Sequence, residues 1–346
     1  MGTTTRRNFI ERTVLTGTVL GMTGGALEVY GHSADMKGRK IGMIGLDTSH
    51  CVAFTKALNS PEVKDEFFGY RIVAAYPHGS RDIASSVERI PGYTAEVQKY
   101  GVKIVQSIEE LIAESDVVLL ETNDGRLHLE QAIPVIKAGK RMFIDKPMTA
   151  SLADAISIFD AARKWKVSIF SGSSLRYITG MDEIISGHFG KILGAETYSP
   201  AKLEKTHPDL FWYGIHGVET LFAAMGTGCK SVVRTSNENT DLVTGVWNDG
   251  RIGTFRGIRK GTADYGGTIF CESAIRVLGG YAGYNPLLVQ IINFFMTGIA
   301  PVREEETLEI LAFMEAADRC KTSMGVPVLM ENVMREAAEK ASRIKI

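Results

Sequence analysis

The feature that most constrains the fold is a regular alternation of short β-rich runs with helical segments from Lys40 onward. Between the runs, apolar residues recur every three or four positions, as on the buried face of a helix. Alternation of this kind predicts a parallel, doubly wound sheet with helices on both faces. The expected strands are KIGMIGL, YRIVAAY, VKIVQ, DVVLLET, RMFID and KVSIF.

The pattern changes after about Ser171, where longer strands follow one another with less helix between them. These strands predict an open, mainly antiparallel sheet, and three helices are expected near residues 284–298, 304–324 and 330–343. The segment WNDGR predicts a hairpin in which Asp249 and Gly250 supply the positive φ angles of a type I′ turn.

The first 34 residues differ from the rest of the chain. Arg6 and Arg7 precede a short, glycine-diluted apolar stretch, an arrangement that resembles a twin-arginine export signal. The apolar stretch is shorter than the roughly 20 residues that a membrane span needs. We therefore expect a periplasmic protein without a stable membrane anchor.

Net charge and cysteine spacing limit which kinds of binding partner the protein is expected to have. A formal net charge of −1 provides no basic face for nucleic acid, so the expected partner is a small molecule. The four cysteines lie far apart without a CxxC pair, and their spacing predicts no metal site.

The segment TNDGRLHLEQAIPVIKAGKRMFIDKPMTASLADA, residues 122–155, is similar to the most diagnostic stretch of the Gfo/Idh/MocA family (glucose-fructose oxidoreductase, inositol dehydrogenase and MocA). The resemblance implies a Rossmann-like nucleotide-binding domain at residues 40–170 and an α/β substrate and oligomerisation domain at 171–346. It also implies a nicotinamide cofactor, a carbohydrate-like substrate and a homodimer or homotetramer.

Within this stretch, DKP at residues 145–147 resembles the family's EKP tripeptide. The resemblance assigns Lys146 a catalytic role between cofactor and sugar, where an ammonium group favours alkoxide-like charge on the reacting hydroxyl. The same stretch implies that Thr122, Asn123, His128 and Asp145 belong to the cofactor site.

A second segment, FWYGIHGVETL, resembles the family's segment in which a histidine is followed three residues later by an acid. It implies that His216 is catalytic and that Glu219 contacts substrate. The aspartate that many members carry four residues before this histidine is Trp212 here. Arg176 and Tyr177 fall where family members often contact substrate.

The turn IGLDTSH keeps the first glycine of the family's G-x-G-x-x-G motif, Gly45, but has Asp47 and His50 in place of the other two. A carboxylate about 4 Å from a phosphate would cost roughly 1–4 kcal/mol per charge pair. We expect the dinucleotide to bind instead at the N-terminus of the helix that begins near His50, with Thr48, Ser49 and His50 as donors.

The end of the second strand, AAYPHGSRD, lacks the acid that accepts hydrogen bonds from the adenine ribose. His78, Ser80 and Arg81 stand there and could accept a 2′-phosphate, so NADP is preferred over NAD.

These features predict an exported oxidoreductase that moves hydride between NADP or NAD and a sugar or sugar-like alcohol. Two alternatives stay open. One is a cofactor-free or metal-assisted lyase or hydratase in which Asp47, His50, His216 and Glu219 surround a divalent ion or substrate. The other is a periplasmic sugar-binding protein without catalysis.

Overall fold

The computed structural model describes residues 39–346. The predicted export signal lies outside the described residues. Within them, no helix is both long and apolar enough to cross a bilayer.

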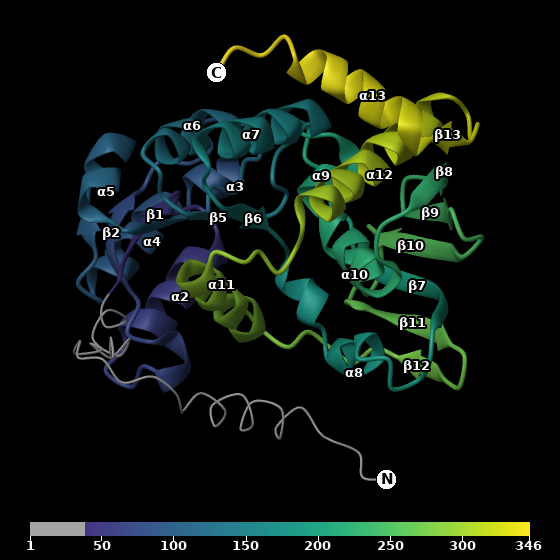
Figure 1. Ribbon diagram of the computed structural model, residues 1–346, viewed down its shortest axis with the longest axis horizontal. Helices are drawn as coiled ribbons and strands as arrows, with labels where there is room; N and C mark the ends of the chain where they lie inside the picture. The colour runs from purple at the N-terminus through teal and green to yellow at the C-terminus, as the bar shows by residue number, and fades with distance from the viewer. Residues whose placement is uncertain (1–38) are drawn as a thin grey trace, which may run out of the picture. The chain divides into compact units, whose positions relative to one another are not determined.

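The first part of the chain, purple to teal in Figure 1, forms a parallel sheet. It has six strands in the order β3-β2-β1-β4-β5-β6. The three central strands β1, β4 and β5 are almost entirely buried because helices cover both faces, which is why their sequences are continuously apolar. The doubly wound fold predicted from the sequence is confirmed. The strands are β1 (Lys40–Ile44), β2 (Arg71–Tyr76), β3 (Lys103–Ile104), β4 (Val117–Leu120), β5 (Met142–Ile144) and β6 (Ile169–Ser171).

Successive side chains of each strand enter opposite cores. Met43 and Leu119 join the core beneath one group of helices, whereas Ile44 and Leu120 join the core on the other face. The first group contains α2 (Ser49–Asn59), α4 (Ile90–Gln98) and α11 (Asn285–Thr297); the second contains α5 (Ile108–Glu114), α6 (His128–Lys137) and α7 (Leu152–Trp165). The short helix α3 (Ala84–Val87) and the 3-10 turn η1 (Asp65–Phe67) lie in the connections.

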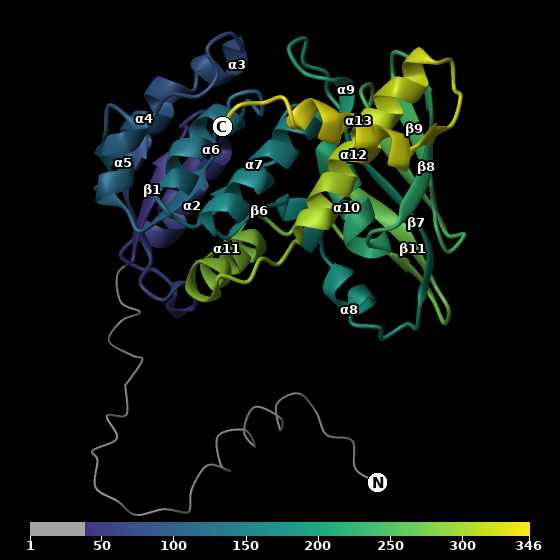
Figure 2. The same cartoon turned by 45° about the horizontal axis from the view of Figure 1, so that its top comes forward.

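Helix α11 comes from late in the chain but packs on the first sheet beside α2 (Figures 1 and 2). Its buried residues Leu288, Ile292 and Phe295 share a core with Met43 and Phe54. The start of α11 lies close to the N-terminus of α2, where the Tyr284 hydroxyl is 2.9 Å from Ser49 Oγ.

The second sheet has seven strands in the order β12-β11-β7-β10-β9-β8-β13, and all its pairs are antiparallel except β7 with β10. One face is covered by α10 (Ile215–Met225) and α12 (Glu304–Thr322), as Figure 1 shows. The remaining elements are β7 (Ile192–Pro200), β8 (Cys229–Ser236), β9 (Thr240–Trp247), β10 (Ile252–Ile258), β11 (Gly266–Cys271), β12 (Ile275–Val277), β13 (Val328–Leu329), η2 (Ser174–Tyr177), α8 (Met181–Ile185), α9 (Asp209–Trp212) and α13 (Met330–Ala341).

Gly217 allows α10 to lie directly against this sheet. A Cβ atom at this position would stand 2.3 Å from the Phe255 ring of β10, closer than packed atoms approach. The glycine next to His216 therefore fixes how deeply that histidine is set into the protein.

The hairpin predicted between β9 and β10 forms, but its turn is not type I′. Gly250 has φ of +86°, whereas Asp249 is not among the residues with positive φ. Trp247 N donates to Arg251 O (2.9 Å) and Gly250 N to Trp247 O (2.9 Å). These bonds close a three-residue loop with a single left-handed glycine.

Candidate active site

A cavity of about 480 Å³ opens at the carboxyl edge of the first sheet and brings together residues from both halves of the chain. Ligands of doubly wound sheets bind at this edge. Lys146 and His216, far apart in the sequence, both line it. The N-terminus of α2 forms a second part of the wall, through Thr48, Ser49 and His50.

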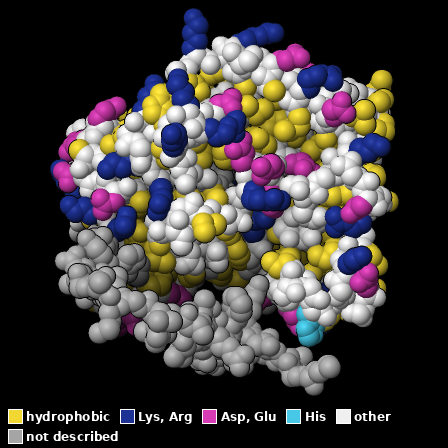
Figure 3. Space-filling model, in the orientation of Figure 1, with side chains coloured by type: hydrophobic (Ala, Val, Ile, Leu, Met, Phe, Trp, Pro, Cys, Tyr) yellow, Lys and Arg dark blue, Asp and Glu magenta, His cyan; other side chains and the backbone are white. Residues whose placement is uncertain are grey.

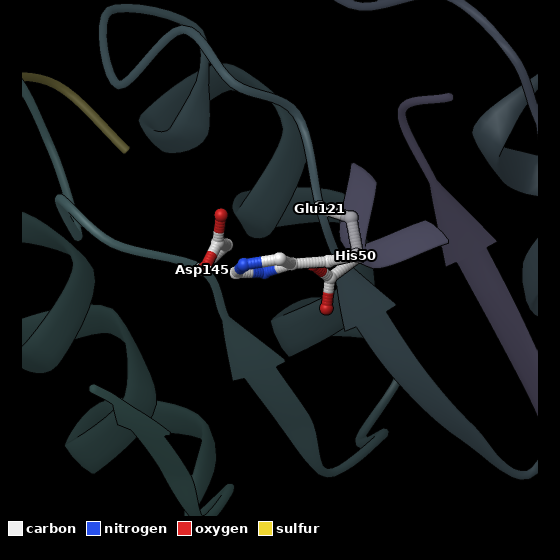
Figure 4. Close-up of side chains that lie close together, drawn as sticks. All are labelled: His50, Glu121 and Asp145. Carbon is white, nitrogen blue, oxygen red and sulfur yellow. Dashed lines mark ion pairs between the residues drawn. The ribbon is translucent and has the colours of Figure 1, made fainter. Parts of the chain in front are cut away.

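Next to Lys146, three polar side chains meet: His50 in the first turn of α2, Glu121 directly after β4 and Asp145 directly after β5. His50 Nδ1 lies 3.1 Å from Asp145 Oδ1 and 3.4 Å from Glu121 Oε2, and Figure 4 shows the imidazole ring between the two carboxylates. Lys146 Nζ stands 3.8 Å from the other oxygen of Asp145. Glu121 follows an apolar strand directly, and this position is the sequence signal that could have identified it.

In this group, burial and the neighbouring charges shift each pKa in opposite directions. Burial disfavours a charged imidazole, but Asp145 and Glu121 outweigh that effect and raise the pKa of His50 to about 10. Burial raises the pKa of Glu121 to about 7, although His50 lowers it in part. Burial also acts to raise the pKa of Asp145, but His50 and Lys146 hold it below its usual range.

His216 forms no ion pair with an acid of the described residues. Its Nδ1 lies 2.8 Å from Ser173 Oγ, which fixes the ring, and Nε2 makes no hydrogen bond with the described residues. Glu219 faces elsewhere: its carboxylate accepts a hydrogen bond from Arg176 (2.8 Å). Burial, followed by the charge of Lys146, holds the pKa of His216 well below 6.5.

We therefore expect the His216 imidazole to stay neutral at pH values where a free histidine is protonated. In Lys146→Met the removed positive charge no longer disfavours the imidazolium, so the pKa of His216 should rise toward its ordinary value. Histidine-selective NMR titration of both proteins measures the shift, with His216→Gln assigning the resonance. An unchanged pKa in Lys146→Met would contradict this electrostatic coupling.

Four tyrosines form an aromatic wall that sequence reasoning did not identify. Tyr265 donates to the hydroxyl of Tyr213 (3.2 Å), and the Tyr281 and Tyr284 rings lie 5.6 Å apart. The ring of His216 lies 5.1 Å from Tyr213 and 5.9 Å from Tyr265. Burial raises the pKa of Tyr265 and of Tyr281, so these phenols stay protonated and can donate hydrogen bonds.

The Asp47 side chain does not face the cavity. Its carboxylate is buried and accepts hydrogen bonds from the backbone N–H groups of Ser80 (3.1 Å) and Asn123 (2.9 Å). Gly79 makes this possible, because a Cβ there would stand 2.1 Å from Asp47 Oδ2. Asp47 thus holds together the loops that follow β2 and β4.

We expect Asp47→Ala to destabilise the protein. Each of the two N–H groups would lose its acceptor, at a cost of roughly 1–3 kcal/mol for a buried donor. Urea unfolding measures the change, with Glu339→Ala on the exposed surface of α13 as the control. Equal stability of Asp47→Ala and the control would show that the two hydrogen bonds contribute nothing.

Other predicted cofactor residues lie outside the cavity. Ser80 Oγ donates to Asp124 Oδ2 (3.0 Å), and His78 packs against Tyr76, with their ring centroids 5.2 Å apart. Arg81 is exposed. Ser80 thus already has an acidic partner, Asp124 from the loop after β4, and the choice between NADP and NAD stays open.

The remaining predicted residues have structural partners. Both ring nitrogens of His128 lie near carbonyl oxygens, at 2.9 Å from Met148 O and 2.6 Å from Thr122 O. Gly45, with φ of +87°, packs against Thr122, so a Cβ would be 2.5 Å from the Thr122 nitrogen. Tyr177 does not line the cavity, nor does Arg176, which pairs with Glu306 as well as Glu219.

The structure thus brings Thr48, Ser49, His50, Asn123 and Lys146 of the predicted cofactor residues to the cavity, together with His216. It adds residues that the sequence analysis did not select. These are Ser85, Arg89, Tyr93, Ser174, Leu175, Lys202, Trp212, Tyr213, Tyr265, Tyr281 and Tyr284.

Residues 40–173 match the oxidoreductase family with an NAD-binding Rossmann fold, Gfo/Idh/MocA. The nicotinamide cofactor class predicted from the sequence, NADP or NAD, agrees with that family. The chain is 31% identical over 122 residues to 1,5-anhydro-D-fructose reductase from Ensifer adhaerens. That match covers 34% of this chain and 36% of the reductase, so it spans about a third of the relative's length.

Solved structures resemble nearly the whole described chain in fold. Scyllo-inositol dehydrogenase from Lactobacillus casei, with bound NAD(H) and scyllo-inositol, has a TM-score of 0.66 at 13% identity; the match covers 85% of this chain and 100% of that one. UDP-N-acetylglucosamine 3-dehydrogenase from Acidithiobacillus ferrooxidans has a TM-score of 0.64 at 15% identity, covering 82% and 99%. The family match thus covers residues 40–173, and the solved structures extend the likeness of fold to most of the described chain.

Proposed function

We propose that this protein is an exported oxidoreductase that moves hydride between a nicotinamide dinucleotide and a hydroxyl-bearing carbon of a sugar or cyclic polyol. The observation that carries the proposal is the meeting of Lys146 and His216 in one cavity with the N-terminus of α2. The cavity thus combines a cation, an imidazole held neutral and a helix end suited to phosphate.

The residues along the cavity fit a dinucleotide. Thr48 and Ser49 stand at the start of α2, an 11-residue helix whose first N–H groups and partial positive charge suit phosphate oxygens. Arg89 adds a full positive charge to the lining of the same cavity. The obstacle raised by the sequence, the Asp47 carboxylate, is removed because that side chain points into the loops. When bound, the nicotinamide supplies hydride transfer.

The side chains of this protein can accept and return the proton of the reacting hydroxyl. In the tautomer that donates Nδ1–H to Ser173 Oγ, His216 Nε2 is able to accept that proton. The Lys146 ammonium group stabilises the alkoxide-like charge that forms on the oxygen. In the reverse direction His216 returns the proton.

The aromatic wall supports a carbohydrate-like substrate. Tyrosine rings offer apolar faces to the C–H groups of a sugar ring, and their hydroxyls offer hydrogen bonds to its edge. The names of the relatives, which include a sugar reductase and an inositol dehydrogenase, are consistent with this substrate class. On the face drawn in Figure 3, Lys and Arg side chains are interspersed with acids, so that face has no basic stripe for nucleic acid.

Nucleotide binding and turnover test the proposal separately. Titration of NAD, NADP and their reduced forms, followed by energy transfer from tryptophan to the reduced nicotinamide, should show saturable binding that weakens in Arg89→Ala. Lys99→Ala, an exposed cation away from the cavity, is the matched control. A panel of inositols, hexoses and anhydro-sugars is then tested as substrates. At least one of them should reduce the nucleotide, which is measured as the absorbance of reduced nicotinamide. Turnover of a polyol without any nucleotide would support the lyase alternative instead.

Export and assembly complete the proposal. Arg6 and Arg7 support twin-arginine export, and their replacement by lysine should keep the protein in the cytoplasm. The seven-stranded sheet exposes Leu193 (54%), Ile252 (54%) and Val277 (75%), which supports a homodimer or homotetramer. Light scattering measures the mass, and a monomer at micromolar concentration would contradict assembly.

A further inference from the structure

We propose that His50, Glu121 and Asp145 bind a divalent first-row transition metal ion at the carboxyl edge of the first sheet. The three residues come from the first turn of α2 and from the ends of β4 and β5. Their candidate ligand atoms all lie within 4.8 Å of one another (Figure 4). His50 is 5% exposed, and both acids are fully buried.

The separations match those of neighbouring metal ligands. Bonds of about 2.0–2.2 Å to nitrogen and oxygen place adjacent ligand atoms about 3.0 Å apart in an octahedron and about 3.4 Å apart in a tetrahedron. The imidazole Nδ1 of His50 lies 3.1 Å from Asp145 Oδ1 and 3.4 Å from Glu121 Oε2. One ion placed between these atoms could therefore contact all three without a large rearrangement.

The polar atoms of this cluster lack other partners. His50 Nδ1, both oxygens of Glu121 and both oxygens of Asp145 are buried and form no hydrogen bond with the described residues. Buried polar atoms are almost always paired, because an unpaired group keeps the cost of leaving water. These unpaired atoms indicate a ligand rather than another side chain.

A protonated His50 between the two acids is the other arrangement compatible with these positions. The imidazole Nδ1 carries a single hydrogen, so it can satisfy only one carboxylate oxygen, and the nearby Lys146 ammonium stands 3.8 Å from Asp145. The other carboxylate oxygens would remain unpaired. A metal ion, in contrast, accepts an electron pair from each of the three side chains at once.

The donor set selects the chemical class of the ion. Imidazole favours zinc, iron, copper and nickel, whereas carboxylates favour harder ions such as manganese. One imidazole with two carboxylates therefore suits Zn²⁺ or Mn²⁺ better than Ca²⁺, which takes oxygen ligands alone. His50 also lines the cavity beside Lys146, so the ion would stand at the floor of the proposed active site.

Metal binding by the full chain tests the proposal. After treatment with a chelator, the protein should bind one equivalent of Zn²⁺ by calorimetry, and Zn²⁺ should raise its melting temperature. Glu121→Gln and Asp145→Asn keep the side-chain size and should weaken Zn²⁺ binding by more than about 100-fold, since even outer-shell changes cost 10–100-fold. Glu219→Gln, another buried carboxylate, should bind Zn²⁺ like the wild type.

A second measurement decides the question if the variants do not fold. Mn²⁺ added to the wild type should broaden the NMR resonances of His50 well before those of His188, which is exposed. Failure of the wild type to bind Zn²⁺ or Mn²⁺, equal binding by Glu121→Gln, or equal broadening of both histidines would overturn the proposal. Because no nucleotide or polyol is present, these outcomes are separate from the test of the oxidoreductase function.

Discussion

Lys146→Met is expected to lower turnover by about 10²–10⁴-fold, the range for a positioned group that acts on a proton or a developing charge. Methionine keeps most of the side-chain volume but removes the ammonium group. The ammonium group proposed to stabilise charge on the reacting oxygen would then be missing from the cavity. Steady-state kinetics on the substrate found in the polyol panel measures the effect, and it should appear mainly in kcat.

Lys202→Met is the matched control, because Lys202 lines the same cavity and forms no ion pair within residues 39–346. It should lose less than tenfold in turnover. Thermal unfolding of both variants separates loss of chemistry from loss of structure, since Lys146 also stands 3.8 Å from Asp145. If Lys146→Met folds and keeps full activity, the DKP segment resembles the family's EKP segment in structure but not in catalytic role.

The fold was predictable because its determinants are local. The buried strands β1, β4 and β5 appear in the sequence as apolar runs, and the helices as a three-and-four spacing. The helix expected near residues 284–298 corresponds to α11 (Asn285–Thr297). The sequence could not predict that this helix covers the first sheet. Both cores accept apolar side chains, and the choice depends on the path of the chain between the two sheets.

The candidate site was predictable only where a motif marks it. Lys146 and His216 stand in recognisable segments, and the structure places both in the cavity. Glu121 was missed because it was counted as the end of an apolar strand, and its meeting with His50 depends on a contact between distant segments. Tyr281 and Tyr284 lie in a glycine-rich connection without periodicity, so sequence gives no direction for their rings.

The turn after β1 shows how a substituted motif can be misread. Asp47 stands where the family has a glycine, so its carboxylate would repel the phosphates if it faced them. In the structure, the backbone N–H groups of Ser80 and Asn123 turn the carboxylate away. A buried carboxylate takes the orientation in which it accepts hydrogen bonds from buried donors. Here the donors belong to loops, and the sequence pattern does not predict where loops lie.

His216→Ala is expected to lower turnover by about 10²–10⁴-fold, because it removes the imidazole that we propose accepts the hydroxyl proton. The neutral form of His216 is present across the neutral range, since burial and Lys146 hold its pKa below 6.5. Raising the pH toward 8 should therefore not restore the turnover of His216→Ala. His188→Ala, at an exposed position, should keep wild-type kinetics.

The double variant Lys146→Met with His216→Ala separates one catalytic unit from two independent contributions. If the ammonium and the imidazole act on the same oxygen in one step, removing the second group should cost little once the first is gone. The double variant should then lose about as much turnover as the worse single variant. Multiplication of the two single effects would instead show that Lys146 and His216 act in separate steps, and the shared-oxygen mechanism would have to be abandoned.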